Sequence, residues 1–331
     1  MQRLVIGDIH GCWIEFQELL DQAGLSEGDK IIALGDFVDR GPDSPRVLDF
    51  FQREPNAYAI QGNHERKHIR SVRGEVKAAL SQRITRQQLG DDYAKALTFF
   101  ESLPLYLEFP EANLVHGYWE PGLAIEQQRA TVLAGTMGSE KHLRENYDRP
   151  WYELYDGDIP IIVGHHDYAR NRQPFVYRDR VFGIDTSCCH GGVLTAIMLP
   201  DFRFVSVPSR ADYWRAMRNA YKSRQPVREP IAWDEDDQAV LTLLHDHALR
   251  EHAKIVAQLR QQVAYDALSP HEQGKVYAEF VGQTPQSFLL HLARRDELTL
   301  EKMQRVLRNP DRARKVAVEW GLSSPDETTD D

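Results

Sequence analysis

The sequence has no long apolar run, few cysteines and no apolar leader at its start. A short strand-like run, Leu4–Ile6, lies close to the start of the sequence. No stretch approaches the roughly 20 apolar residues that a membrane-spanning helix requires. Three cysteines, Cys12, Cys188 and Cys189, are too few and too poorly spaced for a disulfide framework or a thiolate zinc site. These absences argue against a membrane protein and a secreted disulfide scaffold, and we expect a soluble, cytoplasmic protein.

Charge is distributed unevenly along the 331 residues, which carry a net charge of −10. Residues 229–331 hold 12 Lys/Arg against 19 Asp/Glu, whereas residues 66–86 hold seven Lys/Arg against one acid. The overall balance predicts no stable DNA binding. The basic segment 66–86 is a candidate anion-binding face, and a solvated helix face is the alternative.

Short apolar runs alternate with stretches of helical periodicity over residues 1–208. The strand-like runs are Leu4–Ile6, Ile31–Leu34, Tyr58–Ile60, Asn113–Val115 and Ile161–Val163. Helices are predicted over 13–23, 44–53, 65–88 and 91–102. Two further runs, Gly192–Met198 and Arg203–Val207, indicate a closing hairpin. This order predicts an α/β fold with functional side chains at the carboxyl ends of the strands.

The composition of the sequence and its pattern of apolar residues change after Pro208. The stretches that follow are polar, helix-favouring and separated by prolines, over 211–223, 236–263, 271–281, 285–295 and 299–308. We therefore expect two domains, with a boundary near 209. The first covers residues 1–208, and an all-helical C-terminal appendage covers residues 209–331.

A polar cluster directly follows each of the five strand-like runs. The clusters are Gly7-Asp8-Ile9-His10-Gly11, Gly35-Asp36-Phe37-Val38-Asp39-Arg40-Gly41, Gly62-Asn63-His64-Glu65, His116-Gly117 and Gly164-His165-His166. Carboxylates mixed with imidazoles and one amide oxygen suit Mn²⁺, Fe²⁺ or Zn²⁺ better than Ca²⁺. Several charged groups cannot converge at strand ends without a cation, so the pattern predicts a metal site.

The five clusters, taken in order, resemble those of the calcineurin-like metallophosphoesterases, and within them the phosphoprotein phosphatase branch. The stretch 183–196 resembles the bacterial members, which include diadenosine tetraphosphatases and small Ser/Thr phosphatases. The resemblance covers residues 1–208. It implies a four-layer α/β/β/α sandwich and a metal-dependent phosphoric ester hydrolase.

The resemblance also implies the ligands of two divalent metal ions. These are Asp8, His10, Asp36, Asn63, His116 and His165. The first two would hold one ion, Asp36 would bridge both, and the last three would hold the second. Two such ions can share a hydroxide, lower its pKa towards about 7 and aim it at phosphorus. Because no thiolate is present, Mn²⁺ is the expected metal, with Fe or Zn as alternatives.

Three further residues receive catalytic roles from the same resemblance. His64 would be the general acid that protonates the leaving oxygen, and Asp39 would orient its ring. Arg40 offers a planar fork for the non-bridging phosphate oxygens. No motif in the sequence assigns the role of a second phosphate-binding arginine to a residue. Neighbouring residues on an extended chain point to opposite sides, so only one of His165 and His166 should reach the metal, and we expect His165 because it directly follows Gly164.

The substrate class stays open between related possibilities. Glu65 in the third cluster favours a Ser/Thr protein phosphatase, which we take as the main expectation. The alternative is a dinucleoside-polyphosphate hydrolase or a nucleotide or RNA-end phosphatase. Two features favour this alternative: the basic segment 66–86 and the candidate stacking residues Tyr118, Trp119, Trp151 and Tyr152. A catalytically idle binding module is disfavoured because every motif residue of the implied site is present.

Overall fold

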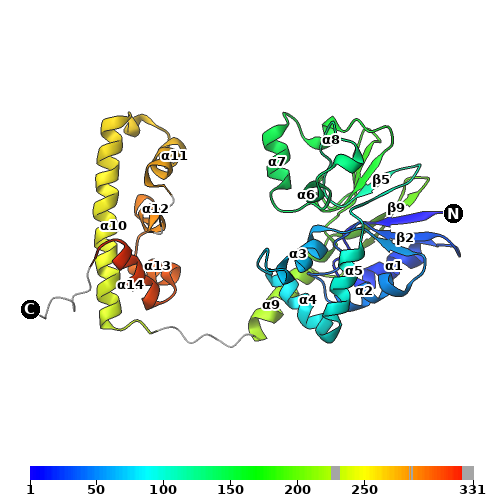
Figure 1. Cartoon of the computed structure of the whole chain (residues 1–331), viewed down its shortest axis with the longest axis horizontal. Helices are drawn as coiled ribbons and strands as arrows, with labels where there is room; N and C mark the ends of the chain where they lie inside the picture. Colours follow the sequence, from blue (N-terminus) through cyan, green and yellow to red (C-terminus); the bar gives the residue numbers. More distant parts are fainter. Residues whose placement is uncertain (225–231, 283, 285, 323–331) are drawn as a thin grey trace, which may run out of the picture. The chain divides into compact units, whose positions relative to one another are not determined.

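The structure of the protein is a computed structural model that describes residues 1–224, 232–282, 284 and 286–322. The chain divides into two compact units, Met1–Gln225 and Pro226–Asp331. Within the described part of the first unit, the strands form two five-stranded mixed sheets (Figure 1).

The first sheet has the strand order β10-β9-β1-β2-β3. Its strands are β1 (Arg3–Ile6), β2 (Lys30–Ala33), β3 (Ala57–Ala59), β9 (Val193–Leu199) and β10 (Arg203–Pro208). β1, β2 and β3 are parallel, whereas β9 and β10 form a hairpin that pairs antiparallel with β1. The three parallel strands therefore end at one edge of the sheet.

The second sheet has the order β4-β5-β6-β8-β7. Its strands are β4 (Tyr106–Glu108), β5 (Asn113–Val115), β6 (Ile161–Val163), β7 (Phe175–Tyr177) and β8 (Val181–Gly183). β5, β6 and β8 are parallel, and β4 and β7 run antiparallel at the two edges. The three parallel strands β5, β6 and β8 therefore also end at one edge of their sheet.

The two sheets pack face to face, and the alternation of side chains along each strand builds three apolar layers. Val5 of β1, Ile32 of β2 and Ile162 of β6 belong to a buried cluster between the sheets. Their neighbours Leu4 and Ile161 point to the outer faces of the first and second sheet respectively. Continuous apolar strands of this kind are typical of sheets that are covered on both faces.

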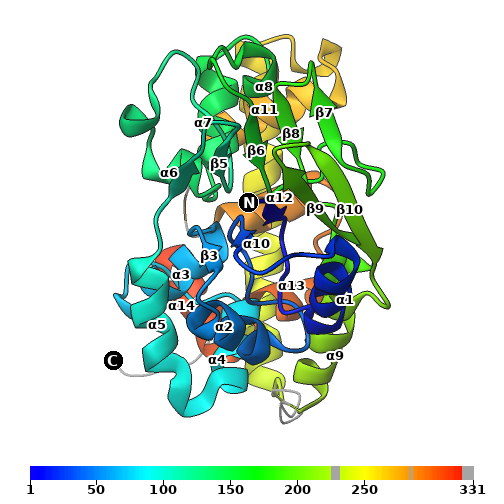
Figure 2. The ribbon, with the colours of Figure 1, turned by 90° about the vertical axis from the view of Figure 1, so that its right-hand side faces the viewer.

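Helices cover both outer faces of the sandwich. The helices of the first half are α1 (Trp13–Ala23), α2 (Ser44–Arg53), α3 (Asn63–Val72), α4 (Leu80–Leu89) and α5 (Tyr93–Ser102). Those of the second half are α6 (Ala130–Leu133), α7 (Ser139–Asn146) and α8 (Trp151–Leu154). Figure 2 shows α1 and α2 on the side of the first sheet and α6 to α8 on the side of the second. The predicted α/β/β/α sandwich is confirmed.

The prediction of one helix over 65–88 is wrong. The segment forms α3 and α4, separated by an irregular stretch. Gly74 lies in that stretch with φ +77, a left-handed conformation that ends α3 and that glycine adopts at little cost. The sequence analysis also missed β4, β7 and β8. β4 and β7 are edge strands without a fully buried residue, unlike the equally short β5 and β6, which were predicted.

The helix α9 (Tyr213–Arg224) belongs to the first compact unit, although the sequence places the domain boundary near 209. The Tyr213 hydroxyl donates to Oε1 of Glu15 on α1 at 2.9 Å, and the Arg210 N–H donates to the same oxygen at 3.0 Å. Glu15 is fully buried, so these two bonds satisfy one of its carboxylate oxygens and tie the start of α9 to the sandwich.

The second unit is helical throughout its described residues. Its helices are α10 (Glu235–Gln262), α11 (Pro270–Val281), α12 (Ser287–Arg294), α13 (Leu300–Leu307) and α14 (Pro310–Glu319). The last was not predicted. Apolar side chains of α12, α13 and α14 pack along α10 around Leu241, Leu244 and Met303. In the described part of the chain, no helix has the length and apolar character that crossing a membrane demands.

Ile162 is a direct probe of the packing between the sheets, because it is fully buried there. We expect Ile162→Ala to lower the free energy of unfolding by about 2–5 kcal/mol and Ile162→Val by about 0.5–1.5 kcal/mol, in proportion to the cavity created. Urea denaturation followed by circular dichroism measures both. Val176→Ala on the exposed edge strand β7 is the control, and equal losses in all three variants would contradict the layered core.

Candidate metal centre and active site

The predicted site residues leave the carboxyl ends of the parallel strands. Asp8 and His10 follow β1, Asp36 follows β2, and Asn63 follows β3. His116 and His165 follow β5 and β6 of the second sheet. Because the sheets pack face to face with these ends on one side, residues up to 157 positions apart in the sequence come into hydrogen-bond contact.

The backbone at the site is left-handed at five residues that are not glycine. His10, Asp36, Asp39, Arg40 and His165 have φ values of 47, 48, 72, 63 and 66. Such conformations cost of order 1–3 kcal/mol each and persist only where the surroundings impose them. They turn the side chains away from the strand direction and towards one another.

Two glycines leave the space that the carboxylates occupy. A Cβ on Gly62 would collide with the Asp36 carboxylate, and a Cβ on Gly164 would collide with that of Asp8. The glycines in the sequence clusters therefore serve close approach as well as turning.

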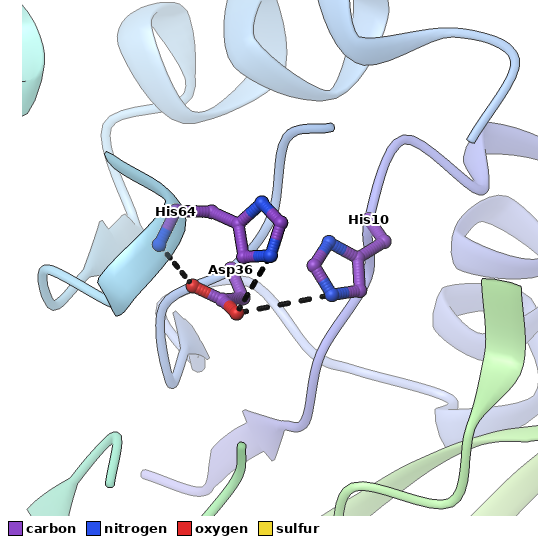
Figure 3. A group of neighbouring side chains, drawn as sticks. All are labelled: His10, Asp36 and His64. Carbon is purple, nitrogen blue, oxygen red and sulfur yellow. Dashed lines mark hydrogen bonds and ion pairs between the residues drawn. The ribbon is translucent and has the colours of Figure 1, made fainter. Parts of the chain in front are cut away.

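The carboxylate of Asp36 lies at the centre of the site (Figure 3). Its Oδ2 is 3.4 Å from Nε2 of His116, 3.8 Å from Nε2 of His10 and 3.9 Å from Nε2 of His64. Its Oδ1 accepts a hydrogen bond of 2.9 Å from the backbone N–H of His64. Three imidazoles thus present the same ring atom to one oxygen.

Backbone carbonyls set the orientation of two of these rings. Nδ1 of His10 lies 2.8 Å from the carbonyl oxygen of Val38, and Nδ1 of His116 lies 2.8 Å from that of Leu34. A carbonyl can only accept, so Nδ1 carries the proton in each ring and Nε2 keeps its lone pair in the neutral form. This is the usual arrangement of a metal-binding histidine.

Asn63, His165 and Asp8 complete the cluster of predicted ligands. Oδ1 of Asn63 lies 3.1 Å from Nε2 of His116 and 2.9 Å from Nδ1 of His165. Oδ1 of Asp8 accepts from the backbone N–H of His165 at 2.8 Å, and its Oδ2 lies 3.8 Å from Nε2 of His10. All six predicted ligands therefore lie close together, whereas the side chain of His166 is exposed and lies outside this cluster.

The donor atoms form two groups that share Asp36. In each group, ligand atoms of three residues lie within 4.8 Å of one another. One group contains His10, Asp36 and His64, and the other contains Asp36, His116 and His165. The first includes His64 where the sequence prediction has Asp8. The arrangement is consistent with a dinuclear metal centre bridged by Asp36.

The electrostatics of these buried residues also fit divalent cations. Burial raises the pKa of Asp8, and the charges of Asp185 and Asp36 raise it further. Burial and the neighbouring His116 lower the pKa of His165 to about 3. Burial works against protonation of His116, but Asp36 and Asp8 outweigh it and raise its pKa to about 10. The two carboxylates that attract a proton to His116 would attract a divalent ion in the same way, because a cation compensates crowded buried carboxylates.

A second network lies behind His64. Nδ1 of His64 is 2.6 Å from Oδ2 of Asp39, and the other oxygen of Asp39 is 2.9 Å from Nε2 of His68. Nε2 of Gln82 donates to the same carboxylate, and Nδ1 of His68 lies 3.0 Å from the Tyr93 hydroxyl. The carboxylate of Asp39 is fully buried and satisfied on both oxygens. Sequence analysis missed His68 and Gln82, because only the packing of α3 and α4 brings them to Asp39.

Glu65 is fully buried and engaged with the backbone. Its carboxylate accepts from the N–H groups of Asp36 at 2.8 Å, Gly62 at 3.0 Å and Val38 at 3.4 Å. Burial and the nearby Asp36 raise its pKa to about 8. Glu65 therefore holds the turns after β2 and β3 against each other.

The guanidinium of Arg40 lies beside the predicted ligands. Its Nη1 is 3.0 Å from Nε2 of His10. Burial opposes its charge, but Cys189, Asp36 and other acidic neighbours raise the pKa of Arg40 above its usual value. Since the lone pair on Nε2 of His10 cannot serve both a donor and a metal ion, metal binding at His10 requires Arg40 to leave this contact.

The family model for calcineurin-like phosphoesterases matches residues 1–174 of this chain. The chain therefore belongs to the calcineurin-like phosphoesterase family. It is a metal-dependent phosphoesterase, and its substrates are phosphoesters.

Two bacterial relatives match over nearly their whole length. The chain is 32% identical over 237 residues to the asymmetrical bis(5′-nucleosyl)-tetraphosphatase PrpE of Halalkalibacterium halodurans, with 63% of this chain and 95% of that protein covered. It is 31% identical over 240 residues to PrpE of Oceanobacillus iheyensis, with 63% and 93% covered. A crystal structure of a protein assigned as a diadenosine tetraphosphatase superposes with a TM-score of 0.52 at 27% identity, covering 63% of this chain and 93% of that one.

Asp36 offers the sharpest test of the metal centre. We expect Asp36→Asn to lower the metal content per chain and the affinity for added Mn²⁺ by about 100-fold or more, since even indirect partners of metal ligands are worth 10–100-fold. Elemental analysis after dialysis measures the first, and titration of activity against Mn²⁺ after EDTA treatment measures the second. Asp91→Asn, in the exposed 3₁₀ helix Gly90–Asp92, is the control. An unchanged metal content in Asp36→Asn would contradict the bridging position.

Proposed function

We propose that this protein hydrolyses dinucleoside tetraphosphates at a dinuclear metal centre. The observation that carries the proposal is the 32% identity to a bis(5′-nucleosyl)-tetraphosphatase of which 95% is covered. The main expectation from the sequence, a Ser/Thr protein phosphatase, rests on Glu65. All contacts of that carboxylate described above are to backbone N–H groups. Glu65 therefore has a structural role and does not indicate the substrate class.

A basic cavity beside the metal centre supports a substrate with several phosphates. The cavity measures about 460 Å³, and Asn63 is part of its wall. Arg66, Lys67, Arg70 and Lys77 also line it. A phosphate chain that reacts beside Asn63 would extend into this cavity and gain charge-assisted contacts.

Three arginines of the basic segment 66–86 make contacts within the protein. Arg70 pairs with Glu75 at 2.9 Å, and Arg73 pairs with Glu101 at 2.8 Å. The guanidinium of Arg86 lies over the ring of Tyr93 at 5.2 Å. The anion-binding face that we propose is therefore the cavity wall around Lys67 and Lys77, because the cations Arg70, Arg73 and Arg86 have partners within the protein.

The metal ligands that we propose are the six residues named in the sequence analysis, with Asp8 and His10 on one ion and Asn63, His116 and His165 on the other. When bound, two divalent ions would activate the attacking water and neutralise charge on the phosphate. Mn²⁺ is the metal that we propose. Arg40 would contact a non-bridging phosphate oxygen once it leaves His10, because its planar guanidinium matches two oxygens at once.

We propose that His64 protonates the leaving oxygen. Its Nδ1 is bonded to Asp39, so its Nε2 is the atom that faces the site and would hold the transferable proton. The Asp39 carboxylate stabilises the protonated ring and fixes its direction. His68 and Gln82 hold that carboxylate in turn, so they are positioning residues.

The role of His64 predicts a dependence on the leaving group. We expect His64→Ala to lower kcat about 10²-fold or more for a poor leaving group such as an alkyl alcohol, because the missing proton is then most needed. An activated aryl phosphate should lose much less, since its phenolate departs without help. Steady-state kinetics on both substrates measure the two losses. A uniform loss would contradict the general-acid role and indicate a ligand role for His64.

A substrate panel tests the proposed function. We expect kcat/KM for diadenosine tetraphosphate to exceed that for phosphopeptides, and the double variant Lys67→Gln/Lys77→Gln to raise its KM several-fold at low salt and to flatten its salt dependence. Aryl phosphate should be unaffected. Lys222→Gln, on the exposed face of α9, is the matched control. Preference for phosphopeptides over diadenosine tetraphosphate would contradict the proposal.

A further inference from the structure

A second cavity lies in the half of the sandwich built on the second sheet. It measures about 400 Å³, within the range of small-molecule sites. Aromatic rings dominate its wall, contributed by Tyr118, Tyr147, Trp151, Tyr152 and Tyr168. A wall of this composition suits a flat ligand that offers π-faces.

This aromatic cavity adjoins the metal centre through shared side chains. The ring of Tyr118 stands edge-on to that of His165, with centroids 5.2 Å apart. His166, the residue after that predicted ligand, also lines the cavity, and its ring is 5.0 Å from that of Tyr168. One side chain therefore separates the cavity from the predicted ligands.

The rings of the wall are held by one another before any ligand binds. Tyr168 stacks on Phe175 with centroids 5.3 Å apart and an angle of 28° between the planes. Tyr152 meets Tyr168 edge-on at 5.9 Å, and Trp151 meets Tyr168 edge-on at 6.2 Å. Trp151 is only 5% exposed. Rings fixed in this way lose little entropy when a ligand stacks on them.

The hydrogen bonding of the wall is incomplete. Among the described residues, Nε1 of Trp151 and Oη of Tyr168 have no hydrogen-bond partner of ordinary geometry. Burial raises the pKa of Tyr168 well above its usual value. Buried polar atoms without partners are uncommon in a closed core.

The charge of the lining distinguishes the cavity from a site for a purely apolar ligand. Arg144, Arg149 and Arg170 outnumber the two acids, Glu140 and Asp148. Stacking rings combined with guanidinium groups are the usual means of holding a nucleotide without reading its sequence.

We infer that the aromatic cavity is the subsite for one nucleoside of the substrate, with the base stacked against the rings of Tyr152 and Tyr168 and its phosphate directed to the metal centre past Tyr118. This inference rests on the proposed function. Residues 136 and 137 line the basic cavity and residues 140–150 contribute to the aromatic one, so α7 begins between them. The base and the remaining phosphates would therefore leave the metal centre on either side of the start of α7.

The first test compares AMP with inorganic phosphate as inhibitors of aryl phosphate hydrolysis, which requires only the phosphoesterase activity. We expect AMP to inhibit about tenfold more tightly than phosphate in the wild-type protein and in Tyr168→Phe, which keeps the ring. Tyr168→Leu should lose most of this advantage with kcat for aryl phosphate unchanged. Tyr58→Leu, which changes an exposed ring on the edge strand β3, is the control.

The inference is overturned if AMP inhibits no more tightly than phosphate in the wild-type protein, or if its advantage is the same in Tyr168→Leu. Where Tyr168→Leu does not fold, Tyr152→Leu takes its place, with the same expected loss, and the wild-type comparison applies in every case.

The second test separates this inference from the proposed function. With diadenosine tetraphosphate, Tyr168→Leu should raise KM about tenfold and leave kcat nearly unchanged. Hydrolysis by the wild-type protein with an unchanged KM in Tyr168→Leu refutes the nucleoside subsite and leaves the function standing. If the wild-type protein does not hydrolyse this substrate but AMP keeps its advantage over phosphate, the function is refuted and the subsite stands.

Discussion

The carboxylate of Asp36 is the charge around which the catalytic half of the chain is arranged. One of its oxygens faces the Nε2 atoms of His10, His64 and His116, and the other is held by a backbone N–H. Burial alone raises its pKa, but these imidazoles outweigh burial and hold the pKa well below its usual value. An ionised carboxylate at this depth requires positive partners, and the two sheets bring them from both sides.

The strand ends, the left-handed turns and the buried networks all serve this one position. Glu65 ties the turn that carries Asp36 to the turn that carries Gly62. Asp39 and its partners hold the ring of His64, and two backbone carbonyls hold His10 and His116. Each of these three rings is thus oriented by a buried group, which is how a fold holds the side chains of a site to the precision that catalysis needs.

The surroundings of the centre differ between the two halves of the sandwich. Beyond Asn63, the first half offers a basic cavity, and beyond His165, the second half offers an aromatic one. A fold and a metal centre define a reaction class, whereas substrate choice depends on what lies next to them. The substrate that we propose, a dinucleoside tetraphosphate, has both a phosphate chain for the basic cavity and a flat base for the aromatic one.

The sequence by itself determined the class of fold and the family, and it predicted the six candidate ligands. Short apolar strands followed by Asp, Asn and His clusters are local features that can be recognised without knowledge of the packing. It did not reveal the break at Gly74, the strands β4, β7 and β8, or the partners His68 and Gln82. Only the tertiary structure decided that Glu65 serves the backbone, that Tyr168 and Trp151 line one cavity, and that Trp119 does not belong to that lining. These depend on contacts between segments far apart in the chain, and no local pattern encodes which side chains meet when two sheets pack face to face.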